Sequence, residues 1–268
     1  MEIRTNLESK KTLLTEELWY LIQLCGSTTV IGIENPYIGY SIEEIEIAEQ
    51  FTLISLLRKN IVNVTNGAVE ISTPVIKSTI ETCVNPQHCL WLIAVRNNRP
   101  DLMAQRFLYF AGEHIVGLEK SDQRTYRLTD IQNDTLGEIL KGYFPDPANP
   151  QPAGTSFVLS QPVFDKVSND FSSGNQAAAR RALAEVGVDA QACEELAAAL
   201  SDDHNYYLAI NIHHPMAVDK CYTEGVGYVQ GKNGGWAMRE YEENGIKNLH
   251  FQPAGLPDFL QMILPLIK

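Results

Sequence analysis

The feature that most constrains the fold is an apolar helical stripe that occurs twice, 123 residues apart. In both copies apolar side chains recur at positions i, i+3, i+4 and i+7, which is the spacing of one buried helical face. Short β-like segments precede each stripe, and the helical pattern ends soon after it. Self-similarity on this scale predicts two copies of one supersecondary unit, each contributing half of a sheet. The stripes are Leu136, Ile139, Leu140 and Tyr143, and Phe259, Met262, Ile263 and Leu266.

Helices and a hairpin are predicted at the start of the first copy. Thr15 is expected to cap one helix, and Ser41 with Glu44 forms a capping box that opens another over residues 41–59. The Asn66-Gly67 pair between two short β-like runs predicts a hairpin with a type I′ turn. The 41–59 helix has a broad apolar face, so we expect it to be well buried. That face consists of Ile45, Ala48, Phe51, Leu53, Leu56 and Leu57.

A meander of four β-strands is predicted in each copy, and it leads into the apolar stripe. The first strand of the first meander is apolar on both faces, which is typical of a central, covered strand. In the second meander, Leu208, Ile210 and Ile212 line one face of the first strand. The expected strands are 88–95, 105–111, 114–119 and 125–128, and then 205–213, 225–229, 235–241 and 246–251.

A proline-rich segment separates the two copies. Pro145, Pro147, Pro150 and Pro152 fall within eight residues, which predicts an extended, semi-rigid linker. We therefore predict a first unit at 1–144, a linker at 145–156 and a second unit at 157–268, able to form one continuous domain. Alanine-rich helices open the second unit. The predicted fold class is α+β, with an antiparallel sheet built from two pseudo-two-fold related meander/helix units and flanked by helical bundles.

The charge balance limits the classes of partner. The chain has 21 Lys and Arg against 33 Asp and Glu, a formal net charge of −12. An acidic surface repels nucleic-acid phosphates and anionic lipids, so neither is expected as a partner. No apolar run approaches the roughly 18 residues of a membrane span, and no signal-peptide pattern is seen. Five widely spaced cysteines are typical of buried thiols in a reducing cytoplasm, where we expect the protein to act.

Motifs for cofactor or metal chemistry are missing from the sequence. It contains no Walker lysine loop, dinucleotide glycine fingerprint, Gly-x-Ser-x-Gly elbow or His-Glu-x-x-His. Adjacent residues of a strand point to opposite faces, so His88 and Cys89 are not expected to share an ion. We therefore predict no metal and no cofactor. The set that comes nearest to a zinc site is Cys83, His88 and Cys89, with His213, His214 or Cys221.

Two alternatives to a binding protein remain open at this stage. The first is a small-molecule hydrolase or transferase in which His213 or His214 acts as general base, with Asp219 or Glu224 nearby. The second is a winged-helix regulator, because helices followed by a hairpin also describe that fold. Its recognition helix would be 41–59, which carries four glutamates and is therefore unsuited to DNA.

Several short motifs along the chain occur together in one known family. They are Leu14–Trp19, Leu56–Arg58, Asn66-Gly67, Gly112, Tyr126–Leu128 and Gly234–Trp236. In this order, and over nearly the full length, the chain resembles the EspG family of cytosolic chaperones associated with type VII (ESX) secretion. Two features depart from that family: Lys59-Asn60 follows Arg58 where a glycine is often found, and the linker is unusually rich in proline.

The resemblance implies a fold, a function and a contact region. The fold is a quasi-two-fold sheet flanked by helical bundles, and the function is non-enzymatic recognition of the apolar tip of a helical secretion substrate. The resemblance leaves a monomer or a homodimer open. In the family, a loop between central strands and the second helical bundle contact the substrate. The matching positions in this chain are Asn97, Asn98, Arg99 and Asp101 in the loop, and Leu183, Leu196 and Leu200 in the bundle.

Overall fold

Ten strands form one sheet in this computed structural model, which describes residues 11–96, 99–131, 139–140, 154–201, 206–216, 220–231 and 234–267. The strand order is β1-β7-β6-β5-β4-β9-β10-β11-β12-β8. The strands are β1 (Lys11–Leu14), β4 (His88–Arg96), β5 (Arg99–Ala111), β6 (His114–Asp122), β7 (Thr125–Ile131), β8 (Phe157–Ser160), β9 (Tyr206–Met216), β10 (Lys220–Gly231), β11 (Gly234–Glu243) and β12 (Ile246–Pro253).

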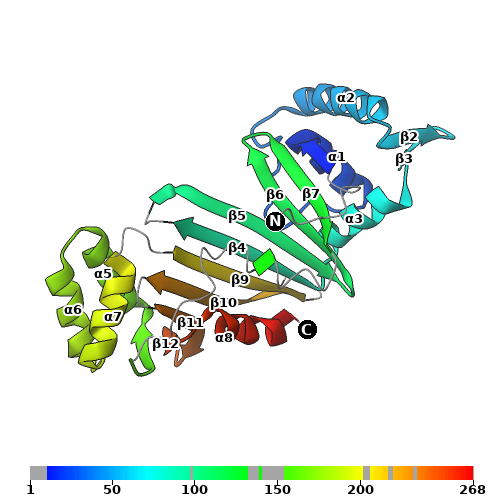
Figure 1. The fold of residues 1–268 in the computed structure, drawn as a ribbon. Helices are drawn as coiled ribbons and strands as arrows, with labels where there is room; N and C mark the ends of the chain where they lie inside the picture. The colour runs from blue at the N-terminus through cyan, green and yellow to red at the C-terminus, as the bar shows by residue number, and fades with distance from the viewer. Residues whose placement is uncertain are drawn as a thin grey trace, which may run out of the picture. The chain divides into compact units, whose positions relative to one another are not determined.

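Helices accompany the strands of both halves, as Figure 1 shows. The first half has α1 (Thr15–Leu24), α2 (Ile42–Arg58) and α3 (Pro74–Val84), and the second has α5 (Gln161–Ser172), α6 (Gln176–Glu185), α7 (Ala190–Ser201) and α8 (Leu256–Ile263). A 3₁₀ turn, η2 (Leu264–Ile267), ends the described chain. A separate hairpin pairs β2 (Val62–Thr65) with β3 (Ala68–Ile71). The α+β prediction is confirmed.

Both predicted meanders are present, with strands longer than expected. Each half also contains a short strand that we did not predict. β1 precedes α1 and pairs antiparallel with β7, and β8 precedes α5 and pairs antiparallel with β12. The order of pairing in one half is therefore repeated in the other. Four residues are too few for a clear alternating pattern, so neither strand can be recognised from the sequence alone.

Contacts along the chain divide it into two compact units, each made of several segments. Unit 1 comprises Met1–Leu90, Arg106–Asn133 and His214–Lys220, and unit 2 comprises Trp91–Gln105, Asp134–His213 and Cys221–Lys268. The predicted linker lies outside the described residues except at 154–156, so the boundaries near residues 144 and 157 remain a prediction. The pseudo-two-fold relation between the halves likewise remains a prediction.

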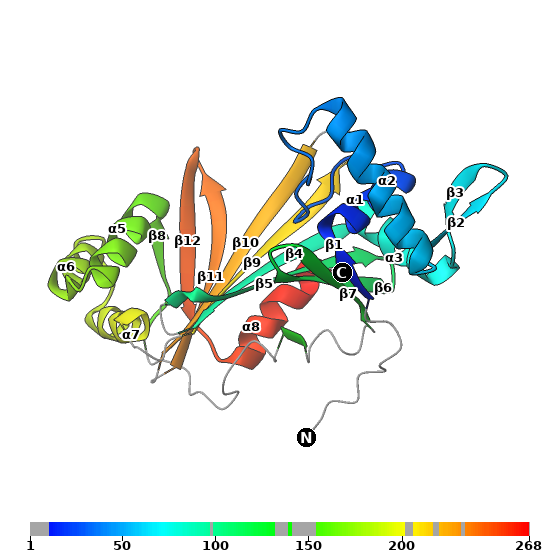
Figure 2. The same cartoon turned by 90° about the horizontal axis from the view of Figure 1, so that it is seen from above.

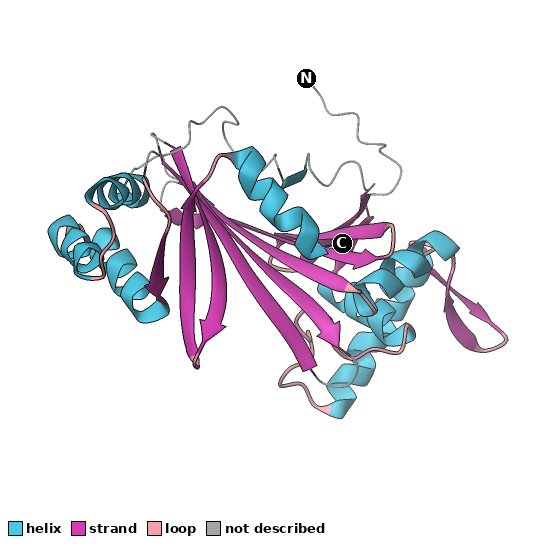
Figure 3. Ribbon diagram, turned by 90° about the horizontal axis from the view of Figure 1, so that it is seen from below, coloured by secondary structure: helices cyan, strands magenta, loops and turns pink. Residues whose placement is uncertain are grey.

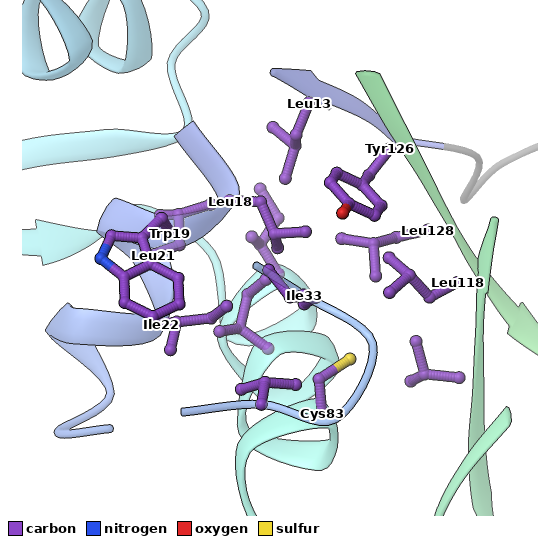
Figure 4. Close-up of a cluster of buried hydrophobic side chains, with 14 of the residues drawn as sticks. Leu13, Leu18, Trp19, Leu21, Ile22, Ile33, Cys83, Leu118, Tyr126 and Leu128 are labelled. Carbon is purple, nitrogen blue, oxygen red and sulfur yellow. The ribbon is translucent and has the colours of Figure 1, made fainter. Parts of the chain in front are cut away.

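The core of unit 1 lies between α1, α3 and the β6–β7 strands (Figure 4). Leu18, Leu21 and Ile22 of α1 are completely buried. They belong to one cluster with Cys83 of α3 and with Leu118 of β6. Cysteine packs here as a small apolar side chain, in agreement with the prediction of buried thiols.

The core of unit 2 forms where α5, α6 and α7 pack beside β8 and β12 (Figures 1 and 2). Val167 of α5 is completely buried in it. The Phe157 and Phe251 rings stack with centroids 5.0 Å apart. Helix α8 lies along the β9–β12 strands (Figure 3), and its Phe259 ring contacts Tyr228 at 5.0 Å. The bundle core therefore consists of small helical residues closed by a layer of aromatic rings.

The prediction that the 41–59 helix is well buried holds for one side of it. Of the six apolar residues expected in its buried face, Leu56 is buried, Ile45, Ala48, Leu53 and Leu57 are half-buried against the unit 1 core, and Phe51 is 69% exposed. Helix α2 packs on α1, and the buried Thr52 lies on the side that faces the core. Apolar residues also occur on the opposite side of α2, so the sequence pattern did not show that Phe51 is exposed.

Several predicted boundaries also differ. The capping residue of α1 is Leu14 rather than Thr15. The gap between the first two strands of the first meander is shorter than the predicted 96–104, because β4 extends to Arg96 and β5 begins at Arg99. Of the stripe at 136–143, only residues 139–140 are described, and both are helical. In the second stripe Leu266 lies in the 3₁₀ turn, where Pro265 ends the α-helical hydrogen bonding.

Candidate functional site

The loop and the bundle that the family resemblance assigns to partner contact belong to the same compact unit. The segment Trp91–Gln105 and helices α5–α7 are all in unit 2. In two perpendicular views the first residues of β5 lie towards the helical bundle (Figures 1 and 2). Asn97 and Asn98 lie outside the described residues, and the backbone of Arg99 and Asp101 is part of β5.

The three predicted bundle leucines occupy the interior of the bundle. Leu183 of α6 and Leu196 of α7 have no exposed surface, and Leu200 is half-buried against the same cluster. In this conformation Leu183 and Leu196 therefore set the packing of the helices and present no surface to a partner. Their part in partner contact remains a prediction.

The exposed surface of the bundle combines charge with isolated apolar groups. Arg180 of α6 forms an ion pair with Glu194 of α7 at 3.1 Å, which ties the two helices together at the surface. Val186, just after α6, is 46% exposed. Asp189 caps α7 by accepting a hydrogen bond from the Ala192 amide at 2.9 Å.

The Gly234–Trp236 motif has a clear physical role in unit 2. A Cβ atom at Gly235 would overlap the Tyr228 ring, which lies on the neighbouring strand β10. The Tyr228 hydroxyl donates a hydrogen bond to the Ala254 carbonyl at 3.2 Å, and burial, with the nearby Asp258 carboxylate, raises the pKa of Tyr228 to about 12. Trp236 is 1% exposed beneath the bundle. Gly235 thus makes room for a buried, protonated tyrosine between sheet and helix.

The histidines proposed for the hydrolase alternative are part of a strand, not of its end. Strand β9 continues through Pro215 to Met216, which corrects the predicted end at His213. His214 Nδ1 lies 2.9 Å from His88 Nδ1 on the neighbouring strand β4, with the rings edge to face. Burial, followed by the charge of His214, lowers the pKa of His88. Asp219 lies outside the described residues, and Glu224 forms an ion pair with Arg239 at 3.3 Å.

A serine, a histidine and a carboxylate do approach one another elsewhere in unit 1. His114 Nε2 lies 3.1 Å from Asp130, and His114 Nδ1 lies 2.9 Å from the Thr82 hydroxyl and 3.4 Å from that of Ser78. They lie at an open hollow of about 410 Å³, which His114, Ser78 and Cys25 help to line. No sequence motif marked this cluster, because its members come from α3, β6 and β7.

This cluster lacks the geometry of a nucleophilic site. Ser78 lies within α3, where the neighbouring backbone N–H groups are used by the helix and cannot stabilise an oxyanion. The Thr82 hydroxyl, which is closer to His114, donates to the Ser78 carbonyl at 2.9 Å. Thr79 donates to Asp130 at 3.2 Å. The network therefore fastens α3 to the β6–β7 hairpin.

The residues named as the nearest approach to a metal site do not converge among those described. Cys83 and Cys89 are buried in the apolar core of unit 1, whereas His88 contacts His214. In the described parts of the chain, no three His, Cys, Asp or Glu side chains are grouped closely enough to bind an ion. Among the same residues, no helix has the length and apolar character needed to cross a membrane.

Known structures provide the comparison that decides the fold. The chain aligns with the Mycobacterium tuberculosis type VII secretion system chaperone EspG5, solved in complex with a PE25-PPE41 dimer. The alignment covers 94% of this chain and 93% of that one, with a TM-score of 0.65 and 14% sequence identity. The chain has the EspG5 fold. The family resemblance read from the sequence is thus confirmed at the level of fold.

Sequence comparisons give no such result. No family model matches the chain, and no curated protein matches it. At 14% identity the likeness to EspG5 rests on the arrangement of helices and strands, which spans nearly the whole of both chains.

Proposed function

We propose that this protein is a non-enzymatic chaperone of the EspG type, which holds the apolar tip of a helical secretion substrate and keeps it soluble before export. The observation that carries the proposal is the EspG5 fold over 94% of the chain, because EspG5 is a secretion chaperone that was solved with a bound protein dimer. Recognition would rest on shape and apolar contact, as in other proteins that bind a helix in a groove.

Substrate contact is assigned to unit 2. The segment Trp91–Gln105, which contains Asn97, Asn98, Arg99 and Asp101, belongs to this unit together with the α5–α7 bundle. Leu183 and Leu196 act from the bundle interior by keeping the outer surface in shape, since both are completely buried. The exposed Val186 is the apolar group of this surface on which a substrate tip would pack.

The charge of the chain supports a protein partner. At a net charge of −12, contact with phosphate backbones or anionic lipids is unfavourable, so neither nucleic acid nor membrane is expected. The substrate would reach the protein in the cytoplasm, before export. No cofactor is needed, because holding an apolar surface requires no bond to be made or broken.

The experiment is affinity purification of the tagged full-length chain from its native cells, followed by binding measurements with the purified partner. We expect a small secreted helical protein in stoichiometric amount. The variants Arg99→Glu and Val186→Asp should weaken its binding about tenfold or more, because the first reverses a charge beside the tip and the second places a charge where the tip packs. The matched control is Val75→Asp in α3 of unit 1, where Val75 is 59% exposed.

Two results would contradict the proposal. One is a purification that returns only nucleic acid or small metabolites. The other is a purified partner whose affinity changes equally little in the two unit 2 variants and in the Val75→Asp control, since this would remove the substrate contact from unit 2.

A further inference from the structure

Helix α2 exposes an apolar stripe on the side turned away from its own core. Ile47 is 55% exposed, Phe51 is 69% exposed and Ile54 is 45% exposed. At about 100° per residue these three side chains fall within an arc of about 60°, roughly opposite the buried Leu56. The stripe therefore faces outward because of the way α2 packs on α1.

The helix that carries this stripe is fixed to its unit. The Ser55 hydroxyl donates to the buried Glu17 carboxylate at 2.7 Å, and Lys59 lies 2.7 Å from the same carboxylate. At the other end, the Ser41 hydroxyl accepts from the Glu44 amide at 3.3 Å. The C-terminal end is thus anchored to α1 and the N-terminal turn is capped, so the stripe is a pre-formed surface rather than a frayed helix.

The two ends of the stripe carry opposite charges. Glu43 is exposed at the N-terminal end and Arg58 at the C-terminal end; at about 100° per residue Arg58 lies within the arc of the stripe, and Glu43 lies about 20° beyond its edge. The next cation, Lys59, is held by Glu17, and Glu44 is used in the capping box. Glu43 and Arg58 are therefore the charges available to a partner of this face.

We propose that α2 is a self-association surface on which a second copy of this chain packs antiparallel. If the two-fold axis passes between residues 50 and 51, Glu43 of one copy faces Arg58 of the other, and Ile47 faces Ile54. The two Phe51 rings meet beside the axis. An interface of this kind uses one patch twice, so each contact is made in duplicate.

The opposite charges at the two ends distinguish between the possible partners of this surface. A parallel copy would place Glu43 beside Glu43 and Arg58 beside Arg58, which is repulsive at both ends. A uniformly basic helix would match Glu43 but not Arg58. An antiparallel second copy satisfies both ends and buries the stripe against itself.

The contact is small, which sets the strength of the association. The stripe from Glu43 to Arg58 is about 22 Å long, so it buries less than the roughly 800 Å² per partner of a standard interface. We therefore expect a reversible dimer with a dissociation constant of the order of tens of micromolar.

The first test is sedimentation velocity of the full-length chain from about 5 to about 300 µM. The sedimentation coefficient should rise with concentration, and Phe51→Glu should abolish the rise while leaving thermal unfolding unchanged. Glu43→Arg and Arg58→Glu should each weaken the dimer about five- to tenfold, because each change creates two like-charge contacts. The double variant Glu43→Arg/Arg58→Glu should restore wild-type association. Val75→Glu, an exposed apolar position outside α2, is the matched control.

The second test is disulfide crosslinking in a Cys25→Ser/Cys221→Ser background, which removes the one partly exposed thiol among Cys25, Cys83, Cys89 and Cys193, together with Cys221, whose side chain is outside the described part of the structure. Gln50→Cys should crosslink with itself. Glu43→Cys should not, yet it should crosslink when mixed with Arg58→Cys. A chain that stays monomeric to 300 µM, association unaffected by Phe51→Glu, or self-crosslinking at position 43 would each overturn the proposal.

Discussion

Lys59 Nζ lies 2.7 Å from the carboxylate of Glu17, and this contact joins the end of α2 to the first turn of α1. Glu17 is 1% exposed and also accepts hydrogen bonds from the Ser55 hydroxyl at 2.7 Å and the Leu14 amide at 2.9 Å. Burial alone raises the pKa of Glu17. The hydrogen bonds from Lys59, Ser55 and Leu14, with the charge of Lys59, outweigh burial, and the pKa is lowered.

Removing one partner of this contact should destabilise unit 1. Glu17→Ala leaves the Leu14 amide and the Ser55 hydroxyl without their acceptor, so we expect a loss of about 2–4 kcal/mol. Lys59→Met should cost less, about 1–2 kcal/mol, because Lys59 is partly exposed. Denaturant unfolding measures both. The control is Lys77→Met, whose surface pair with Glu81 spans 3.8 Å and should change stability by less than about 0.5 kcal/mol. Equal effects at Lys59 and Lys77 would disprove the buried contact.

The same contact predicts how stability depends on acid. Because the folded-state pKa of Glu17 is lowered, the unfolded chain binds more protons as the pH falls below the ordinary value of 4.5. The contribution of Glu17 is therefore present above that pH and is lost as the pH falls through the folded-state pKa. The stability difference between wild type and Glu17→Gln should shrink between about pH 5 and pH 3. A constant difference across this range would contradict the assignment.

The His88–His214 contact predicts a separate loss of stability nearer to neutral pH. The pKa of His88 is lowered by burial and by the charge of His214, so the unfolded chain takes up a proton first as the pH falls below 6.5. The contribution is present above that pH and lost below it. Thermal unfolding from about pH 7.5 to about pH 5.5 should show a steeper fall for wild type than for His88→Gln. Identical slopes would show that the pKa of His88 is the same in the folded and the unfolded chain.

A methyl group at position 235 should not fit. Gly235→Ala places Cβ in the Tyr228 ring, and we expect a loss of about 2–4 kcal/mol by denaturant unfolding. Tyr228→Leu should reduce the added cost of Gly235→Ala, because the overlapping ring is then absent. The control is Gly225→Ala, whose Cβ would approach the flexible Glu240 side chain at 3.3 Å and should cost less than about 1 kcal/mol. Strict additivity of the two substitutions would exclude the proposed overlap.

The bundle core can be tested by truncation. Leu196→Ala removes a completely buried side chain and should cost about 2–4 kcal/mol. Val186→Ala, at a position 46% exposed, should cost less than about 0.5 kcal/mol. If Leu196 instead faced a partner, its truncation would leave the stability of the free protein unchanged.

Local patterns were sufficient for much of the fold. The capping box at Ser41 and Glu44 lies within four residues, and its geometry is as predicted. The Asn66-Gly67 turn is also present, with positive φ at both residues. Alternation at Leu208, Ile210 and Ile212 identified a buried strand face, and all three are completely buried. Each of these signals lies within a few neighbouring residues. The cap, the turn and the strand face could therefore be predicted without knowing the tertiary contacts.

Tertiary structure decided the contacts between distant residues. Strands β1 and β8 exist because β7 and β12 supply their hydrogen bonds. His88 and His214 are 126 residues apart, and no local pattern could bring them together. The exposed side of α2 depended on where α1 packs, since apolar residues occur around most of that helix. The sequence by itself thus determined most of the elements and their order, because their signals are local, whereas long-range packing determined the two short edge strands, which faces are buried and which remain open to a partner.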